Sequence, residues 1–162
     1  VGAYVERMRE KLGLRAWRGE DDERLLHDLL VAMNEGQADF TATFRALGRV
    51  DPYRTESDAA VRAAFRDPRP WARVAPAYTA RLRADGVDPA LRRAAMDAVN
   101  PRVVLRTHLA QRAIERAQQG DGAEAQRLLA VLRRPFDAGP DDDPDAAPPP
   151  RDAAPVVLSC SS

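Results

Sequence analysis

Apolar residues that recur every three to four positions constrain the fold of this chain more than any other feature of its sequence. In residues 20–33, one face of a helical wheel collects Leu25, Leu26, Leu29, Leu30 and Met33. The acidic residues 21–23 suit the first turn of that helix, where the macrodipole favours negative charge, and Gly36 is a good stop signal. The pattern predicts a mainly α-helical protein.

Shorter segments with the same period follow along the chain. Residues 39–47 predict a second helix, whose inner face would be formed by Phe40, Phe44 and Leu47. Ser57 is the expected N-cap of a third helix, with the inner residues Val61 and Phe65. The final helix is expected after a turn at residues 120–122. Its predicted inner face consists of Ala125, Leu128, Leu129 and Leu132.

Prolines set the expected boundaries of the later helices. Pro76 lies within residues 71–84 and would cost about 3 kcal/mol in a helix interior, so we expect a bend or a new helix there. Asp88–Pro89 is typical of an N-cap followed by the first helical residue. Asn100–Pro101 repeats this device and predicts the longest helix, which runs to about Gln119 with an inner face of Leu105, Leu109 and Ala113.

The composition changes after Arg134. Residues 135–162 contain seven of the 13 prolines and six aspartates against one arginine, a net charge of −5. Such a segment buries too little apolar surface to offset its ordering entropy. The sequence therefore predicts a helical body over residues 1–134 and an extended or disordered Pro/Asp-rich tail over residues 135–162, in which Val156–Leu158 could dock on a surface.

The whole chain has the composition of a globular protein, with 162 residues of which 44% are hydrophobic and 31% charged. The total net charge is zero, so residues 1–134 carry +5 against the −5 of the tail. No apolar run approaches the roughly 20 residues that span a bilayer, and the first residues lack the apolar core of a signal peptide, so we expect none. With a single cysteine, these features predict a cytosolic protein without a membrane role.

Arginine supplies 24 of the 25 basic residues, which raises the question of phosphate binding. The arginines lie among acidic residues without a basic stripe, so we expect no nucleic-acid partner. A phosphate-binding row on the long helix could be formed by Arg102, Arg106, Arg112 and Arg116. The alternative, which we prefer, is a solvent-facing surface with Glu115 as an ion-pair partner.

Metal-ligand patterns are weak in this sequence. His27 and His108 are 81 positions apart and lack the spacing of a zinc site, so packing or surface roles are expected. The acidic residues 21–23 could bind a metal, but a helix N-terminus explains them better. Residues 141–143 could hold a cation loosely, and a solvated acidic run is the alternative. We assign no catalytic, cofactor-binding or metal-binding residue.

Cys160 is the one residue of the tail that invites a chemical role. It is the only cysteine of the chain, and it lies in the last segment, Ser159–Ser162. It has no possible disulfide partner within the chain. The sequence leaves two interpretations open, a small residue without function or a candidate redox residue whose thiol would be more reactive than free cysteine.

Short segments spread along the chain carry a family resemblance. The longest runs from Asn100 to Gln111 (NPRVVLRTHLAQ) and is followed by Ala113–Ile114. The others, in chain order, are residues 11–14, 39–41, 44–45, 120–121, 128–129, 132–137, 147–150 and 159–162. Together these segments resemble the selenoprotein O (SelO) family.

The resemblance implies a kinase-like protein that binds ATP in a reversed orientation and transfers AMP to hydroxyl side chains of other proteins, with Mg²⁺ or Mn²⁺. It covers about the C-terminal third of such a protein, the helical part of the large lobe. The nucleotide-binding, metal-binding and catalytic residues would lie upstream, so this chain alone is expected to be inactive. The implied partners are the N-terminal kinase-like region and the protein substrates, in a bacterial cytoplasm.

The resemblance also gives Cys160 a more specific meaning. Cys160 matches the position where animal members carry selenocysteine and many bacterial members carry cysteine, a position linked to redox regulation. Its disulfide partner would lie outside this chain. The alternative to the enzyme is a helical interaction module without catalysis, from a split or truncated gene. In either case we expect exposed apolar helix faces.

Overall fold

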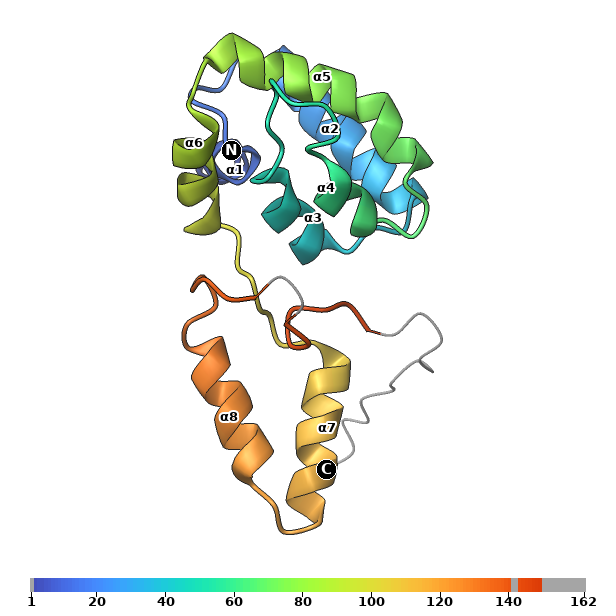
Figure 1. Cartoon of the computed structure of the whole chain (residues 1–162), viewed down its shortest axis with the longest axis vertical. Coiled ribbons are helices and arrows are strands. Elements are labelled where there is room, and N and C mark those ends of the chain that lie inside the picture. The colour runs from blue at the N-terminus through green and yellow to red at the C-terminus, as the bar shows by residue number, and fades with distance from the viewer. Residues whose placement is uncertain (1, 141–142, 150–162) are drawn as a thin grey trace. The chain divides into compact units, whose positions relative to one another are not determined.

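The protein is all helix and loop in the part of the chain that the computed structural model describes, residues 2–140 and 143–149 (Figure 1). Its helices are α1 (Gly2–Leu12), α2 (Glu20–Glu35), α3 (Phe40–Leu47), α4 (Ala59–Ala63), α5 (Arg69–Asp85), α6 (Pro89–Asp97), α7 (Thr107–Gln118) and α8 (Ala123–Leu132). The predicted mainly α-helical class is confirmed. Two compact units divide between Pro101 and Arg102, whereas composition had suggested a boundary after Arg134.

The first unit, Val1–Pro101, is built around α2 and α5, which lie side by side (Figure 1). Trp71 is fully buried, and its ring lies 6.4 Å from that of Phe65 and 6.1 Å from that of Tyr78. The polar atoms of these rings are satisfied, since Trp71 Nε1 donates to Asp58 at 2.8 Å and the Tyr78 hydroxyl donates to the Leu12 carbonyl at 2.9 Å. This aromatic cluster joins α1, α4 and α5 into one core.

Local signals position several helix ends as predicted. Asp39 Oδ1 accepts a 2.8 Å hydrogen bond from the Ala42 amide at the start of α3. Asp88 caps α6 in the same way, and Pro89 is its first residue. Gly36 ends α2, where an added Cβ would lie 2.5 Å from the Phe65 ring, so only glycine fits.

The predicted N-cap role of Ser57 is wrong. Its hydroxyl bonds back to Asp51, donating to the carbonyl at 2.8 Å and accepting from the amide at 3.0 Å. The bond stabilises the loop before α4 and leaves Ser57 outside the helix, which begins at Ala59. Val61 and Phe65 are buried as predicted.

Pro76 lies inside one continuous helix, α5, so the expected new helix at this residue is not formed. Pro76 and Ala72, the residue whose carbonyl loses its hydrogen bond, are both exposed, which lets water replace that bond. The opposite face of α5 is buried on both sides of the proline through Trp71, Val74, Tyr78 and Leu82. Core packing therefore outweighs the cost of the proline.

The predicted helix start at Asn100–Pro101 is also wrong, because α7 begins only at Thr107. Asn100 is fully buried, and its side-chain amide donates to the Lys11 carbonyl at 3.0 Å. A side chain used in this way cannot cap a helix. As a result Leu105, expected on the inner face of that helix, is 59% exposed. The longest helix of the described residues is α5, and not α7 as predicted.

The second unit, Arg102–Ser162, contains the antiparallel pair α7 and α8 (Figure 1). Gly120 has a φ of +84°, which suits glycine and confirms the predicted turn between the two helices. The apolar core of the pair is small, consisting of Leu109, Ala113 and Leu128 with a half-buried Leu132. Leu129, predicted to face inward, is 50% exposed.

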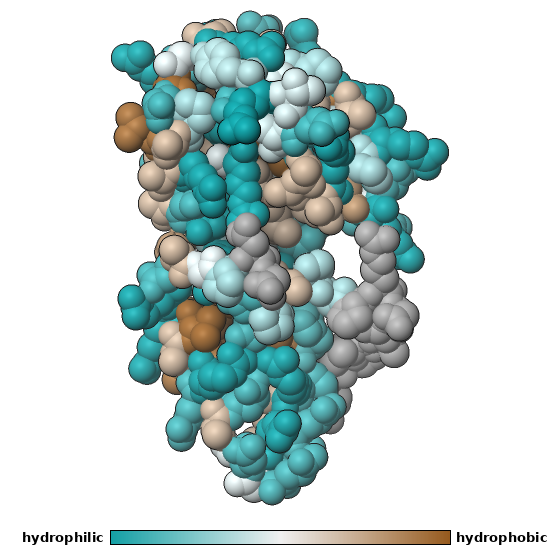
Figure 2. Space-filling model, in the orientation of Figure 1, coloured by the Kyte–Doolittle hydropathy of each residue, from teal (hydrophilic) through white to brown (hydrophobic). Residues whose placement is uncertain are grey.

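Hydrophilic residues cover most of the face shown in Figure 2, with separate hydrophobic patches between them. Exposed large apolar residues occur on both units, among them Tyr4, Tyr53, Leu91 and Leu105. No helix of the described residues combines the length and the hydrophobicity that crossing a membrane requires.

Candidate functional site

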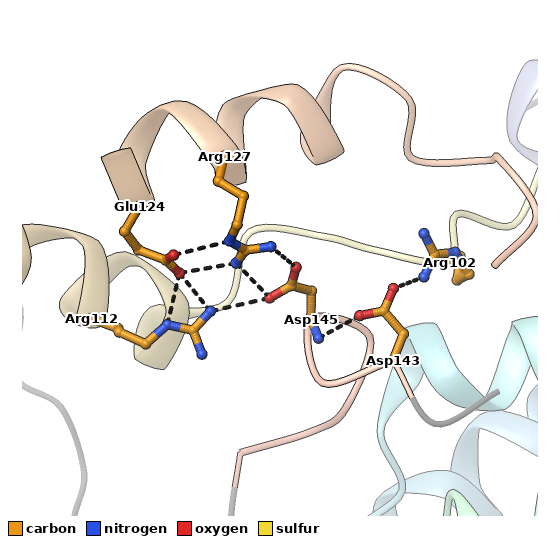
Figure 3. Close-up of polar contacts among 6 residues, drawn as sticks. All are labelled: Arg102, Arg112, Glu124, Arg127, Asp143 and Asp145. Atoms are coloured by element: carbon orange, nitrogen blue, oxygen red, sulfur yellow. Dashed lines mark hydrogen bonds and ion pairs between the residues drawn. The ribbon is translucent and has the colours of Figure 1, made fainter. Parts of the chain in front are cut away.

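Arginines of the second unit converge with carboxylates of the segment that follows α8 (Figure 3). We call this arrangement the arginine–carboxylate cluster, and its members are Arg102, Arg112, Glu124, Arg127, Asp143 and Asp145. It brings together residues that are up to 43 positions apart, from the segment before α7, from both helices and from the tail.

Asp145 is the centre of the cluster. Its carboxylate accepts hydrogen bonds from Arg127 at 2.6 and 3.0 Å and from Arg112 at 3.1 Å. The same two arginines bind Glu124 of α8, with Arg112 Nε at 2.8 Å and Arg127 Nε at 2.9 Å. Asp145 is 4% exposed, so the tail covers this carboxylate against the helix pair.

A second contact of the tail lies at Arg102. Its guanidinium pairs with Asp143 and donates to the Asp137 carbonyl at 3.1 Å, while its amide donates to the Pro135 carbonyl at 2.7 Å. The Asp145 amide in turn donates to Asp143 Oδ1 at 2.8 Å. The described tail residues therefore have no helix, but they are held in place by several polar contacts.

These contacts shift the titration of the cluster. Hydrogen bonds from Arg127 are the main cause that lowers the pKa of Glu124 to about 2 and the pKa of Asp145 below its usual value. Partial burial and the nearby Arg106 and Arg112 lower the pKa of His108. The carboxylates thus remain charged at neutral pH, and they neutralise Arg112 and Arg127.

The predicted phosphate-binding row is not formed. Arg102 and Arg106 precede α7, and each contacts the tail, Arg106 through a 3.3 Å hydrogen bond to the Ala146 carbonyl. Arg116 lies 3.9 Å from Asp121. The predicted partner Glu115 instead accepts from Gln111. Sequence reasoning missed the role of the tail, although its −5 charge beside a +5 body was a signal for it.

The candidate metal ligands do not assemble in the described residues, which contain no group of three or more His, Cys, Asp or Glu side chains suited to a metal ion. Asp22, from the acidic first turn of α2, is fully buried against Arg81 at 2.7 Å. His27 is exposed on α2, and His108 is half-buried on α7. Residues 141–142, Val156–Leu158 and the candidate redox residue Cys160 lie outside the described residues.

Buried charge in the first unit has a structural role that sequence patterns did not predict. Arg81 bridges Asp22 and Asp85, at 2.7 and 2.5 Å, and donates to the Ala16 carbonyl. Arg92, 4% exposed, donates to backbone carbonyls at the end of α3, including Leu47 at 3.3 Å. These contacts join segments that are far apart in the chain.

A groove of about 420 Å³ lies between the end of α1 and α6. Its apolar lining includes Leu14, Val87, Leu91, Ala95 and Val99. Arg9 and Arg15 lie among the residues that line the α1 side. A concave apolar surface with basic residues beside it has the character of a binding surface.

Comparison with known proteins places these observations in a family. The family described as protein adenylyltransferase SelO matches residues 1–133. Proteins called protein nucleotidyltransferase YdiU are 49% identical in Burkholderia pseudomallei (strain 1710b) and Burkholderia thailandensis, and 46% identical in Paraburkholderia xenovorans. Each match covers 99% of this chain and 31% of the relative, so the chain spans about a third of the length of these proteins. The chain belongs to the SelO family.

Proposed function

We propose that this chain is the C-terminal helical part of a SelO-type protein adenylyltransferase, which transfers AMP from ATP to Ser, Thr or Tyr hydroxyls of protein substrates. The observation that carries the proposal is the 49% identity to nucleotidyltransferases named YdiU over 99% of the chain. Its role within the enzyme is to brace the large lobe of a kinase-like domain in a bacterial cytoplasm.

The chemistry of this proposal lies outside the 162 residues. Nucleotidyl transfer from ATP needs positioned cationic groups and a divalent metal, here Mg²⁺ or Mn²⁺, to stabilise phosphate charge. The described residues contain no group of three or more His, Cys, Asp or Glu side chains suited to a metal ion. In the arginine–carboxylate cluster, Arg112 and Arg127 are already paired with Glu124 and Asp145. Because the family resemblance implies that the catalytic residues lie upstream of this chain, we expect the chain alone to be inactive.

A chimera tests the function directly. The matching third of the Burkholderia thailandensis relative is replaced by this chain, and AMP transfer from α-³²P-labelled ATP is measured with Mg²⁺ or Mn²⁺. We expect labelling by the chimera, and none by the relative without that third or by the 162-residue chain. An inactive chimera that melts cooperatively would refute the proposal. Self-labelling of the isolated chain would refute the non-catalytic role assigned to it.

The second candidate function is a helical interaction module without catalysis, favoured by the exposed apolar residues of both units, such as Leu91 and Leu105. The coding sequence directly upstream of Val1 separates the two functions. Kinase-like motifs in the same reading frame support the enzyme, whereas their absence supports the module.

We also propose Cys160 as a redox residue of the enzyme. The proposal rests on its match to the terminal selenocysteine or cysteine position of the family. A measurement of thiol alkylation rate against pH tests it. A redox-active thiol should have a pKa clearly below the usual value of about 8.5, and an ordinary value would argue against the role.

A further inference from the structure

We infer that the groove between α1 and α6 is the docking surface for an amphipathic helix from the part of the SelO-family protein outside this chain, and that this helix carries carboxylates beside its apolar face. The inference rests on the proposed function, since it requires that this chain be part of the longer protein. It deepens that proposal by naming the surface and the chemistry of its occupant.

Two sets of residues on and beside α6 face different surroundings. Met96 faces the core of the first unit, and the neighbouring turn provides the buried Arg92. A second set of apolar residues lines the groove instead, Leu91 and Ala95 on α6 and Val87 and Val99 in the segments on either side of that helix. Leu91 and Ala95 are four positions apart and lie on one face of α6, and the two valines extend this apolar ridge beyond the helix ends.

The ridge lacks a partner within the described residues. Leu91, near its middle, is 70% exposed, the largest exposed fraction of the large apolar side chains described. The opposite wall consists of the last turns of α1 and the turn after it, where Gly13 lets the backbone approach Met96 closely. The groove has α6 on one side, the end of α1 on the other and an open apolar surface, which is a shape that can hold one helix laid along it.

Basic side chains give the groove its charge. The side chain of Arg15 is exposed and makes no hydrogen bond or ion pair with any described residue. Arg92, beneath the groove, donates to carbonyls and forms no ion pair with a described carboxylate. The only acidic residue of the lining, Glu10, is paired with Arg7. The groove is therefore left positive, and a helix with carboxylates complements it.

Relatives of this chain are about three times as long as the chain itself. The chain covers 31% of the length of its relatives, so about two thirds of such a protein lies outside it. The groove lies within residues 1–133, the part that matches the family. An apolar ridge in this matched part would be buried in the longer protein, because exposed apolar grooves mark contact surfaces.

Accessibility of position 91 tests the inference. Leu91→Cys is introduced, with Cys160→Ser, into both the chimera described above and the 162-residue chain. Each protein is treated with a bulky fluorescein maleimide, and the labelled peptide is identified by mass spectrometry. Labelling rates are normalised to those in urea. We expect position 91 to react at least about tenfold more slowly in the chimera than in the isolated chain.

A charge reversal provides the second measurement. Arg15→Glu should lower the melting temperature of the chimera by more than that of the 162-residue chain, because the acidic helix is present only in the chimera. The Asp85 carboxylate that accepts from the Arg15 amide at 2.7 Å is present in both proteins. Arg24→Glu is the matched control, since Arg24 is exposed on α2 outside the groove. An equal drop with Arg24→Glu, or no drop with Arg15→Glu, overturns the predicted charge of the occupant.

The two proposals fail in different ways. If the chimera transfers AMP but position 91 labels equally fast in both proteins, the groove is not a docking surface, while the proposed function stands. If a cooperatively folded chimera is inactive, the proposed function fails and the docking inference fails with it. A chimera that is active, protected at position 91 and sensitive to Arg15→Glu supports both.

Discussion

The two units of this protein are stabilised by different forces. The first unit packs nineteen buried apolar residues into one core around Trp71, whereas the described part of the second has only Leu109, Ala113 and Leu128. What the second unit lacks in apolar contacts is replaced by the arginine–carboxylate cluster. Apolar burial depends weakly on pH and salt, but ion pairs depend strongly on both, so the two units should respond differently to the same change of conditions.

The largest expected effect concerns the core of the first unit. Trp71→Ala should reduce the free energy of unfolding by about 3–5 kcal/mol, because it leaves a cavity between Phe65 and Tyr78. Urea unfolding followed by the fluorescence of the remaining Trp17 measures the loss. Tyr53→Ala, at a side chain that is 62% exposed, is the control and should change little.

Buried charge in the same unit should have the next largest effect. Asp22→Ala leaves Arg81 buried with Asp85 as its remaining carboxylate, so we expect a loss of about 3 kcal/mol. Asp21→Ala is the matched control, since it removes an exposed carboxylate from the same helical turn. Equal urea midpoints for the two variants would show that the buried pair does not stabilise the unit.

The ion pairs of the second unit should be individually weaker. Arg127 is 44% exposed, so a double-mutant cycle of Asp145→Ala and Arg127→Ala should give a coupling free energy of about 1 kcal/mol. Amide hydrogen exchange in α8 is the measurement, because it reports local opening. The same cycle at Asp137 and Arg134, a more exposed pair, should give almost none. A larger coupling there would contradict the role assigned to Asp145.

Acid should destabilise the second unit before the first. We expect this loss of stability to be smaller than the effects of the substitutions above. Because the folded pKa of Glu124 is about 2 and its ordinary value is 4.5, its stabilising contribution is present above about pH 4.5 and lost as the pH falls toward 2. The lowered pKa of Asp145 acts in the same direction. The NMR signals of His108 should therefore change in this range before those of His27, and 1 M NaCl should bring a similar change near neutral pH. If the signals of His108 and His27 changed at the same pH, the two units would not differ in their dependence on ion pairs.

Local sequence signals predicted the fold wherever a helix end depends on its own neighbours. Asp39 and Asp88 cap α3 and α6 as expected, because an aspartate before a helix bonds amides only two or three residues away. Gly120 joins α7 and α8 for an equally local reason, its positive φ. These features need no knowledge of the rest of the chain.

The predictions failed where a partner outside the predicted helix competes with the local signal. Ser57 bonds to Asp51, and Asn100 bonds to Lys11, which is 89 residues away, so neither caps a helix. Pro76 is tolerated because the buried side of α5 keeps the helix intact. The arginine–carboxylate cluster was missed for a similar reason, since composition showed only that the tail and the body carry opposite charge.

The sequence by itself determined the helical class, most helix ends, the charge difference between body and tail, and the resemblance to the SelO family, because each depends on residue type and short spacing. Tertiary structure alone decided which polar groups meet, where the two units divide and which apolar row of α6 is left open. Those outcomes depend on contacts such as Arg81 with Asp22 and Asp145 with Arg127, whose geometry exists only after the helices have packed.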